Sequence, residues 1–160
     1  MAFYGNLIIK VGGVIRQYVG GGLQLFVDTK ISTVTLTPAQ IRALFATPVS
    51  LIATPGAGFT IQVVNIMATN TFGTAAYTGA NALEFRYTDG SGTKVTADIA
   101  AAFINIGSGT QTNSVAGVIT DFTHTANAPL VVRVPTADPG GGTATGTIRI
   151  SVLYRVIPTT

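Results

Sequence analysis

Short stretches of the chain alternate between apolar and polar residues with a period of two, as in a β-strand with one buried face. The clearest stretches are 83–88 (LEFRYT) and 147–157 (TIRISVLYRVI). Other short runs are rich in β-branched and aromatic residues, which favour strands. The predicted strands are 32–36, 49–53, 59–67, 83–88, 94–99, 117–123, 130–134 and 147–157. The apolar run 100–106 could form a strand or a helix, and we favour a strand.

Turn-forming residues separate these runs at intervals of about ten residues, the spacing typical of β-sandwiches. Examples are Pro55-Gly56, the stretch 89–92 (DGSG) and the stretch 139–142 (PGGG). Strands and helices do not alternate, which argues against a parallel α/β sheet. The pattern therefore predicts an all-β protein, an antiparallel β-sandwich of jelly-roll-like type with about eight strands.

One short helix is predicted near 38–46. Thr37 is a suitable N-cap, Pro38 fits the first helical position, and Gln40 completes a capping box with Thr37. Pro48 follows just beyond the predicted end. Three apolar residues fall on one face of this helix: Ile41, Leu44 and Phe45. We expect that face to cover an open end of the sandwich.

Residues 1–30 differ from the rest, because short apolar runs alternate with single and clustered glycines. Glycine weakens a free-standing strand or helix, yet the apolar content is unlike that of a disordered tail. We therefore divide the chain into an extended, glycine-rich N-terminal arm (1–30) and a β-sandwich domain (31–160). The residues expected to contact a partner are Phe3, Tyr4, Leu7, Ile9, Val14, Ile15, Tyr18, Leu23, Leu25 and Phe26.

The composition is unusually poor in charge. Charged residues make up 9% of the chain, against about 25% in an ordinary soluble domain. This deficit favours a surface covered by partners; the alternative is a small soluble sandwich that uses hydroxyl groups in place of charges. The net charge is +3 and the basic residues are scattered, so we expect no nucleic-acid partner.

The sequence contains no sign of a membrane or secretory segment. No apolar stretch approaches the roughly 20 residues of a membrane-spanning helix. Residues 1–6 lack the basic and apolar regions of a signal peptide. We expect a protein made in a cytoplasm, without a membrane partner.

Candidate chemical groups are few. With one histidine and no cysteine, the usual zinc sites are excluded. His124 and Asp121 lie three residues apart, which places them on opposite faces of an extended strand and argues against a triad with a serine such as Ser114. The six carboxylates show no marked pair, and Asp89 with Asp98 lacks the spacing of a calcium loop. We predict no catalytic residues, no metal and no cofactor, and hence no enzyme.

The body of the chain resembles the capsid decoration (cement) proteins of tailed bacteriophages. The residues that carry the resemblance are 34–41 (VTLTPAQI), 51–58 (LIATPGAG), 74–80 (TAAYTGA), 83–87 (LEFRY) and 152–156 (VLYRV). The resemblance implies a β-sandwich on the outside of a viral head that forms a homo-oligomer, a trimer or a dimer, and clamps major capsid protein subunits. It implies a location on the virion surface after synthesis in the host cytoplasm.

Two other functions stay open from the sequence. The chain could be another structural part of a virion: a jelly-roll coat protein, a head–tail protein or a fibre component. It could also be a module that binds glycans or cell surfaces. Such modules usually present stacking aromatic side chains; the chain has no Trp, and the candidates are Tyr77, Tyr87 and Tyr154.

Overall fold

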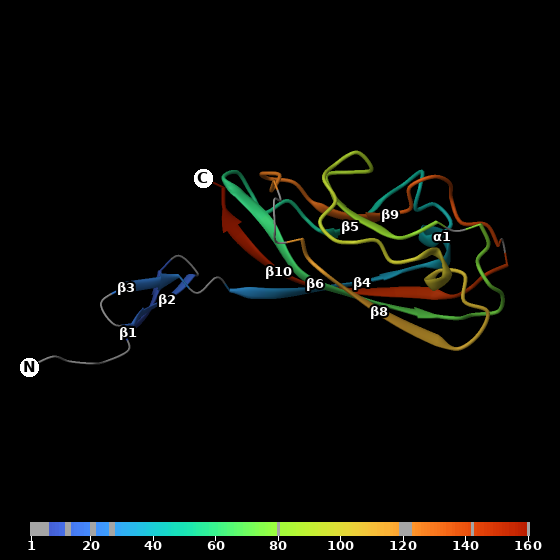
Figure 1. Ribbon diagram of the computed structural model, residues 1–160, viewed down its shortest axis with the longest axis horizontal. Helices are drawn as coiled ribbons and strands as arrows, with labels where there is room; N and C mark the ends of the chain where they lie inside the picture. The colour runs from blue at the N-terminus through green and yellow to red at the C-terminus, as the bar shows by residue number, and fades with distance from the viewer. Residues whose placement is uncertain are drawn as a thin grey trace, which may run out of the picture.

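Two antiparallel sheets face each other across a shared apolar core in the computed structural model (Figure 1). Side chains are described from residue 28 onward, except at residues 80, 119–122, 142 and 160. The structure describes the backbone at residues 7–11, 14–19, 22–25, 28–79, 81–118, 123–141 and 143–159.

The larger sheet has four strands in the order β4-β10-β6-β8. Its long central strands, β10 (Thr147–Pro158) and β6 (Phe59–Thr71), pair with each other along their whole length. The outer strands are β4 (Thr29–Leu36) and β8 (Thr110–Ala116). One β-bulge, between Leu153 and Tyr154 in the register of β10 with β6, interrupts the otherwise regular pairing.

The smaller sheet has the order β5-β9-β7. Its strands are β5 (Val49–Ile52), β9 (Leu130–Arg133) and β7 (Glu84–Tyr87). The segment 94–99 continues this sheet irregularly, through the antiparallel bridges of Lys94 with Arg86 and of Ile99 with Leu83.

The order of pairing is that of a jelly roll. In chain order, the first strand of the sandwich pairs with its last (β4 with β10) and the second with the second-last (β5 with β9). The third strand pairs with the third-last (β6 with β8). The innermost pair is β7 with the segment 94–99. Nested antiparallel pairing of this kind places alternate strands in two facing sheets. The predicted all-β, jelly-roll-like sandwich is confirmed.

The core forms because one face of each sheet is apolar. Along β10, Ile148, Ile150 and Val152 are fully buried, as their period of two predicts. Phe85 and Tyr87 of β7 oppose them from the smaller sheet and are also fully buried. The largest fully buried side chains are Tyr87, Phe85, Phe103, Leu36, Ile41, Leu44, Ile61, Ile66, Leu83, Ile99, Ile104 and Leu130.

Within residues 1–30 the structure describes three short strands: β1 (Leu7–Val11), β2 (Val14–Val19) and β3 (Gly22–Leu25). They form an antiparallel sheet of their own, in which Leu7 pairs with Tyr18 and Arg16 with Leu25. The glycine-rich segment thus folds back on itself as a meander, while β4 already begins at Thr29.

Helix α1 (Pro38–Ile41) begins as predicted. The Thr37 hydroxyl accepts the backbone N–H of Gln40, and the Gln40 side chain accepts the N–H of Thr37, which completes the capping box. Figure 1 shows α1 at one end of the sandwich, between the sheets. No helix among the described residues is long and apolar enough to cross a membrane.

The helix is shorter than the predicted span of 38–46, because residues 42–46 form turns. The Asp138 carboxylate accepts the N–H groups of Phe45 at 2.7 Å and Ala46 at 3.2 Å, which removes them from the helical ladder. Ile41 and Leu44 are buried as expected, but Phe45 is 42% exposed. The Arg133 guanidinium lies over the Phe45 ring, 5.6 Å from its centroid.

Two predicted strands differ in the structure. Residues 101–103 form a 3₁₀ helix, which lets the consecutive side chains of Phe103 and Ile104 both reach the core. In place of a strand over 117–123, the preceding polar stretch forms β8, and Gly117 makes a single bridge to Thr96. A Cβ at Gly117 would come within 2.0 Å of the Val63 carbonyl oxygen. Residues 119–122 lie outside the described part of the chain.

The core predicts a large effect for Phe85→Ala. Removing this fully buried ring deletes contacts on both sheets and leaves a cavity, so the free energy of unfolding should fall by about 3–5 kcal/mol. Ile31→Ala is the control, because Ile31 is 72% exposed and its truncation should change stability by less than about 0.5 kcal/mol. Urea unfolding followed by circular dichroism measures both, and equal effects would contradict this core.

Candidate interaction surface

The outward side of the larger sheet carries mostly hydroxyl and amide side chains. We call it the hydroxyl face. Because side chains alternate along a strand, its members lie between the buried core residues of β4, β6, β8 and β10. We define it by nine residues, and the same side of β4 and β10 continues beyond them through Ile31, Leu153 and Arg155. The nine are Thr33, Thr35, Asn65, Met67, Thr69, Thr112, Ser114, Arg149 and Ser151.

The strand register lines these side chains up in rows across all four strands. One row runs Thr35, Arg149, Thr69, Thr112 from β4 to β8. The next row runs Thr33, Ser151, Met67, Ser114. Cross-strand neighbours of this kind lie about 4.5–5.5 Å apart at Cβ, so each row is a continuous strip of contacts.

The polar groups of the face bond to one another across the strands. Such bonds hold the side chains in place without a partner, while a hydroxyl can still donate or accept a further bond. The pairs are Thr33 with Ser151 at 3.1 Å, Thr69 with Thr112 at 3.2 Å, and Ser114 with Asn65 at 3.0 Å.

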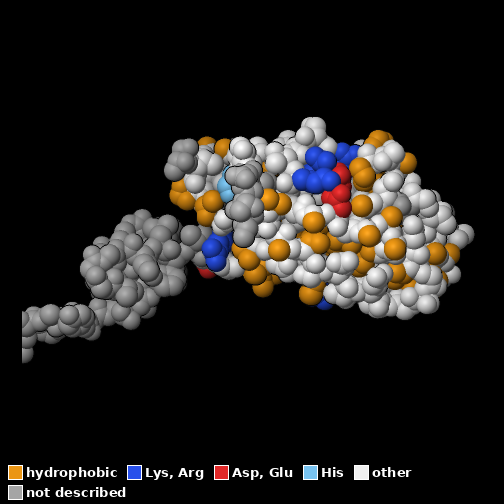
Figure 2. All heavy atoms as spheres, in the orientation of Figure 1, with side chains coloured by type: hydrophobic (Ala, Val, Ile, Leu, Met, Phe, Trp, Pro, Cys, Tyr) orange, Lys and Arg blue, Asp and Glu red, His pale blue; other side chains and the backbone are white. Residues whose placement is uncertain are grey.

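Only Arg149 among the nine residues of the hydroxyl face carries a charge. Met67, near the centre of the face, is 43% exposed. In the view of Figure 2, charged side chains gather in a few places, and most of the visible described surface is backbone or uncharged side chains. A surface of this kind can be covered by a partner without stripping water from many ions, which is costly.

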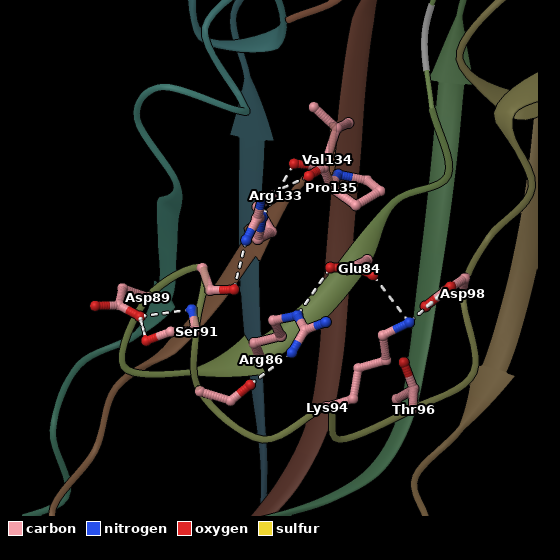
Figure 3. A network of polar contacts seen from close by, with 12 residues as sticks. Glu84, Arg86, Asp89, Ser91, Lys94, Thr96, Asp98, Arg133, Val134 and Pro135 are labelled. Carbon is pink, nitrogen blue, oxygen red and sulfur yellow. Dashed lines mark hydrogen bonds and ion pairs between the residues drawn. The ribbon is translucent and has the colours of Figure 1, made fainter. Parts of the chain in front are cut away.

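The charged side chains instead form a compact network on β7 and the loop that follows it (Figure 3). Glu84, which is 4% exposed, accepts from Arg86 Nε at 2.8 Å and from Lys94 Nζ at 2.9 Å. Lys94 also pairs with Asp98 at 2.8 Å. Arg86 Nη1 donates to the Gly92 carbonyl at 2.8 Å, so the network ties the loop to the sheet.

The pKa of Glu84 reflects two opposing effects. Burial of its carboxyl group raises the pKa, but the hydrogen bonds and positive charges of Arg86 and Lys94 outweigh burial and hold it below its ordinary value. Conversely, the bonds from Lys94 to Asp98 and Glu84 raise the pKa of Lys94. Each group is thus stabilised in its charged form.

Most of the other described acidic groups accept hydrogen bonds that stabilise loops and turns of this chain. Asp89 accepts the N–H and hydroxyl of Ser91, both at 2.8 Å, and Asp138 holds the turn after α1. Figure 3 shows Asp89 and Asp98 at opposite sides of the network, so they do not form a shared calcium site. In the described part of the chain, no three His, Cys, Asp or Glu side chains come together as metal ligands would.

His124 lies beside the buried Tyr87, with its Nδ1 atom 3.1 Å from the tyrosine hydroxyl. Burial lowers the pKa of His124. It lines a small hollow, together with Thr60 and residues 157–159 at the end of β10. Ser114 lies on the hydroxyl face, bonded to Asn65, and Asp121 is outside the described residues.

The tyrosines suggested for glycan stacking do not offer free rings. Tyr77 is 3% exposed and its hydroxyl donates to the Gly146 carbonyl at 2.7 Å. Tyr87 is fully buried, and Tyr154 packs against the core. A sugar ring stacks on an accessible aromatic face, so the burial of Tyr77 and Tyr87 argues against the glycan-binding alternative.

The ten residues predicted to contact a partner all lie where side chains are not described. Phe3, Tyr4 and Phe26 fall outside the described backbone as well. The other seven, in β1, β2 and β3, are Leu7, Ile9, Val14, Ile15, Tyr18, Leu23 and Leu25. Their role in binding is therefore still a prediction.

The hydroxyl face was not anticipated from the sequence. The one sequence feature that indicates it is the alternation of polar and apolar residues in 147–157 (TIRISVLYRVI) and 32–36 (STVTL). Which hydroxyls stand side by side depends on strand order and register, which the alternation within one strand does not contain.

Among solved structures, the comparisons give distant likenesses, one of which is described here. No family model matches the chain, and no curated protein matches it. A chain of a solved cyanophage Pam1 capsid asymmetric unit is similar, with 16% sequence identity and a TM-score of 0.46. The likeness covers 81% of this chain and 84% of that chain. At this distance it assigns neither a family nor a function.

The Glu84 network predicts a loss of stability in acid. The pKa of Glu84 is lower in the folded state than in the unfolded state. The stabilisation of the folded protein by the ionised carboxylate is therefore fully present above the unfolded pKa, and it disappears as pH falls through the folded pKa. Glu84→Gln should therefore reduce the fall in unfolding free energy between about pH 6 and pH 3. Asp28→Asn, at an exposed carboxylate, is the control. Equal pH profiles for Glu84→Gln and the unchanged protein would contradict the network's role.

Proposed function

We propose that the chain is a non-enzymatic structural protein of a phage particle, which binds the outside of the capsid and bridges major capsid subunits. The hydroxyl face is the observation that carries this proposal. It is a regular sheet surface, four strands wide, with one charged side chain among its nine residues and its polar groups already organised.

The chemistry of the face suits a broad protein contact. Hydroxyl and amide groups can donate or accept, so they can bond to a partner's backbone and side chains without a strict charge pattern. Met67 adds a polarizable, adaptable apolar group near the centre of the face. Stable interfaces bury on the order of 1,600 Å² in total. Contacts from residues 1–30, where apolar residues alternate with glycines, would add to the area of the face.

The non-enzymatic part of the proposal is supported by how the described reactive groups are used. Glu84, Asp89, Asp98 and Asp138 each accept bonds that hold a loop or turn. His124 lies against Tyr87. An acid–base site needs groups held ready for a substrate, whereas these groups serve the fold.

In this role the protein works through linkage. A protein that binds the assembled capsid, and not the free subunits, stabilises the assembly by its binding free energy. We propose that it acts as a homo-oligomer, a trimer or dimer, on the virion surface after synthesis in the host cytoplasm.

A jelly-roll coat protein is the second candidate, and the nested strand pairing is the observation that favours it. The effect of removing the chain from purified particles separates the two functions. A decoration protein can be removed from purified particles and leaves a closed shell, whereas removal of a coat protein destroys the shell.

The decoration role predicts that particles lacking the chain are lost sooner on heating or at low salt than complete particles. Adding the purified protein back should restore their survival. Met67→Glu should weaken binding to stripped particles by about tenfold or more, because it buries an unpaired carboxylate in the contact.

Phe59→Glu is the matched control, since Phe59 is on the same strand, is 42% exposed, and lies outside the hydroxyl face. Co-sedimentation with stripped particles measures both variants, and thermal melts check that each is folded. Equal survival of complete and stripped particles would contradict the decoration role. Normal binding by Met67→Glu would show that another surface makes the contact.

A further inference from the structure

The four strands of the larger sheet carry positive charge only. Their sequences contain no Asp or Glu, and their charged residues are Lys30, Arg149 and Arg155. Alternation along β10 places both arginines on the side of the hydroxyl face, whereas Lys30 pairs with Tyr154 and belongs to the opposite side. These strands therefore offer cations, and no carboxylate, to a partner that covers the face.

Arg149 differs from the other described arginines because it has no partner within the described part of the fold. It is exposed, and no hydrogen bond or ion pair among the described residues involves it. Each of the other four donates a hydrogen bond to its own chain: Arg42 to the Ala144 carbonyl at 2.7 Å, Arg86 to the Glu84 carboxylate at 2.8 Å, Arg133 to the Val134 carbonyl at 3.0 Å, and Arg155 to the Thr29 hydroxyl at 3.4 Å. Arg149 is thus the described arginine whose guanidinium is left for a partner.

Arg149 also lies inside the hydroxyl face, between Thr35 on β4 and Thr69 on β6. Met67 is its diagonal neighbour, since Thr69 stands opposite Arg149 and Met67 stands opposite Ser151. Diagonal neighbours lie about 7–8 Å apart, within reach of long side chains. Methionine and arginine are both enriched at protein–protein interfaces. The one charged and the one large apolar side chain of the face are therefore neighbours.

Covering this face sets a chemical condition on the partner. The Arg149 guanidinium stays charged at any ordinary pH, and burying it without an opposite charge is costly. Its planar fork matches a carboxylate, which accepts two parallel N–H bonds from it. The hydroxyl of the neighbouring Thr35 can add a donor to the same site. A surface that presents a carboxylate at this point removes the cost of burial, whereas a surface without one does not.

We propose that Arg149 binds a carboxylate, the side chain of an Asp or Glu on the outer surface of the major capsid protein. The hydroxyl groups around Arg149 can bond to many arrangements of polar groups, so they do little to fix where the face sits. A charged pair is directional and rejects mismatched partners. This one contact therefore sets the position of the hydroxyl face on the shell.

The inference rests on the proposed capsid contact and names the chemistry that this contact requires of the capsid. Met67→Glu and the Arg149 variants test different parts of it. Loss of binding by Met67→Glu, together with normal binding by Arg149→Gln, would overturn the carboxylate pair and leave the capsid contact standing. Normal binding by both variants would overturn both.

Arg149→Gln removes the charge and the fork while keeping a polar side chain. Its dissociation constant for stripped particles, measured by co-sedimentation, should rise by about tenfold or more, because the capsid carboxylate is left unpaired. Arg149→Glu should raise the constant further, by about a hundredfold, since two carboxylates then face each other. Thermal melts check that each variant is folded, and no shift is expected because Arg149 makes no bond within the described fold.

Lys30→Gln is the matched control, because it removes the same charge from the same sheet on the side opposite the hydroxyl face. It should leave the dissociation constant nearly unchanged. Equal losses in Lys30→Gln and Arg149→Gln would indicate a general attraction by net charge, and that result would overturn the proposal.

A cross-link without a spacer identifies the partner group. Carbodiimide joins an amine to a carboxylate as an amide, and Arg149→Lys places an amine where the guanidinium was. This variant keeps the charge but loses the fork, so it should bind more weakly than the unchanged protein and more tightly than Arg149→Gln. Mass spectrometry of treated particles should find residue 149 joined to an Asp or Glu of the major capsid protein. Cross-links from the other lysines alone, none at all, or a cross-link from residue 149 only to a second copy of this chain would overturn the proposal.

Discussion

The register of β10 between β4 and β6 is the constraint on which most of the structure depends. Its even-numbered residues Ile148, Ile150 and Val152 enter the core, while Arg149 and Ser151 stand on the opposite face. A slip of one residue against either neighbour would exchange these two sets and bury a charge. Burial of the apolar set thus fixes the position of every hydroxyl in the rows that cross the sheet.

This coupling explains how a protein so poor in charge can present an ordered surface. The few described charges are largely used locally: Glu84, Arg86, Lys94 and Asp98 hold one loop to the smaller sheet. The larger sheet is left with hydroxyl and amide groups that bond to one another across strands. Such a face stays hydrated when free, and covering it costs little desolvation free energy, because Arg149 is the one charged residue among its nine members. The low charge of the composition thus agrees with the proposed contact role of this face.

The sequence predicted those elements in which local pattern and tertiary contacts agree. The alternation in β7 and β10 gave the correct buried faces, and the capping box at Thr37 and Gln40 gave the correct helix start. β8 was missed because its residues are nearly all polar: it is an edge strand whose place is set by β6 and not by its own burial. The 3₁₀ turn at 101–103 was read as a strand because its apolar run has no period.

The sequence predicted the type of function, a packing role, but not the residues that form the candidate surface. Scarcity of charge and absence of a catalytic set pointed to a packing function, and the predicted contacts were placed in residues 1–30. The hydroxyl face joins residues from β4, β6, β8 and β10, up to about 120 positions apart in the sequence. No local pattern reports such neighbours, whereas the order and register of the strands determine them.

A reconstruction of the purified particle at side-chain resolution tests the central claim most directly. The account predicts density for this chain on the outside of the shell, with Ser151 and Met67 of the hydroxyl face buried against capsid subunits. A chain located inside the shell or in the tail, or one whose hydroxyl face is open to solvent while another surface makes the contact, would contradict it.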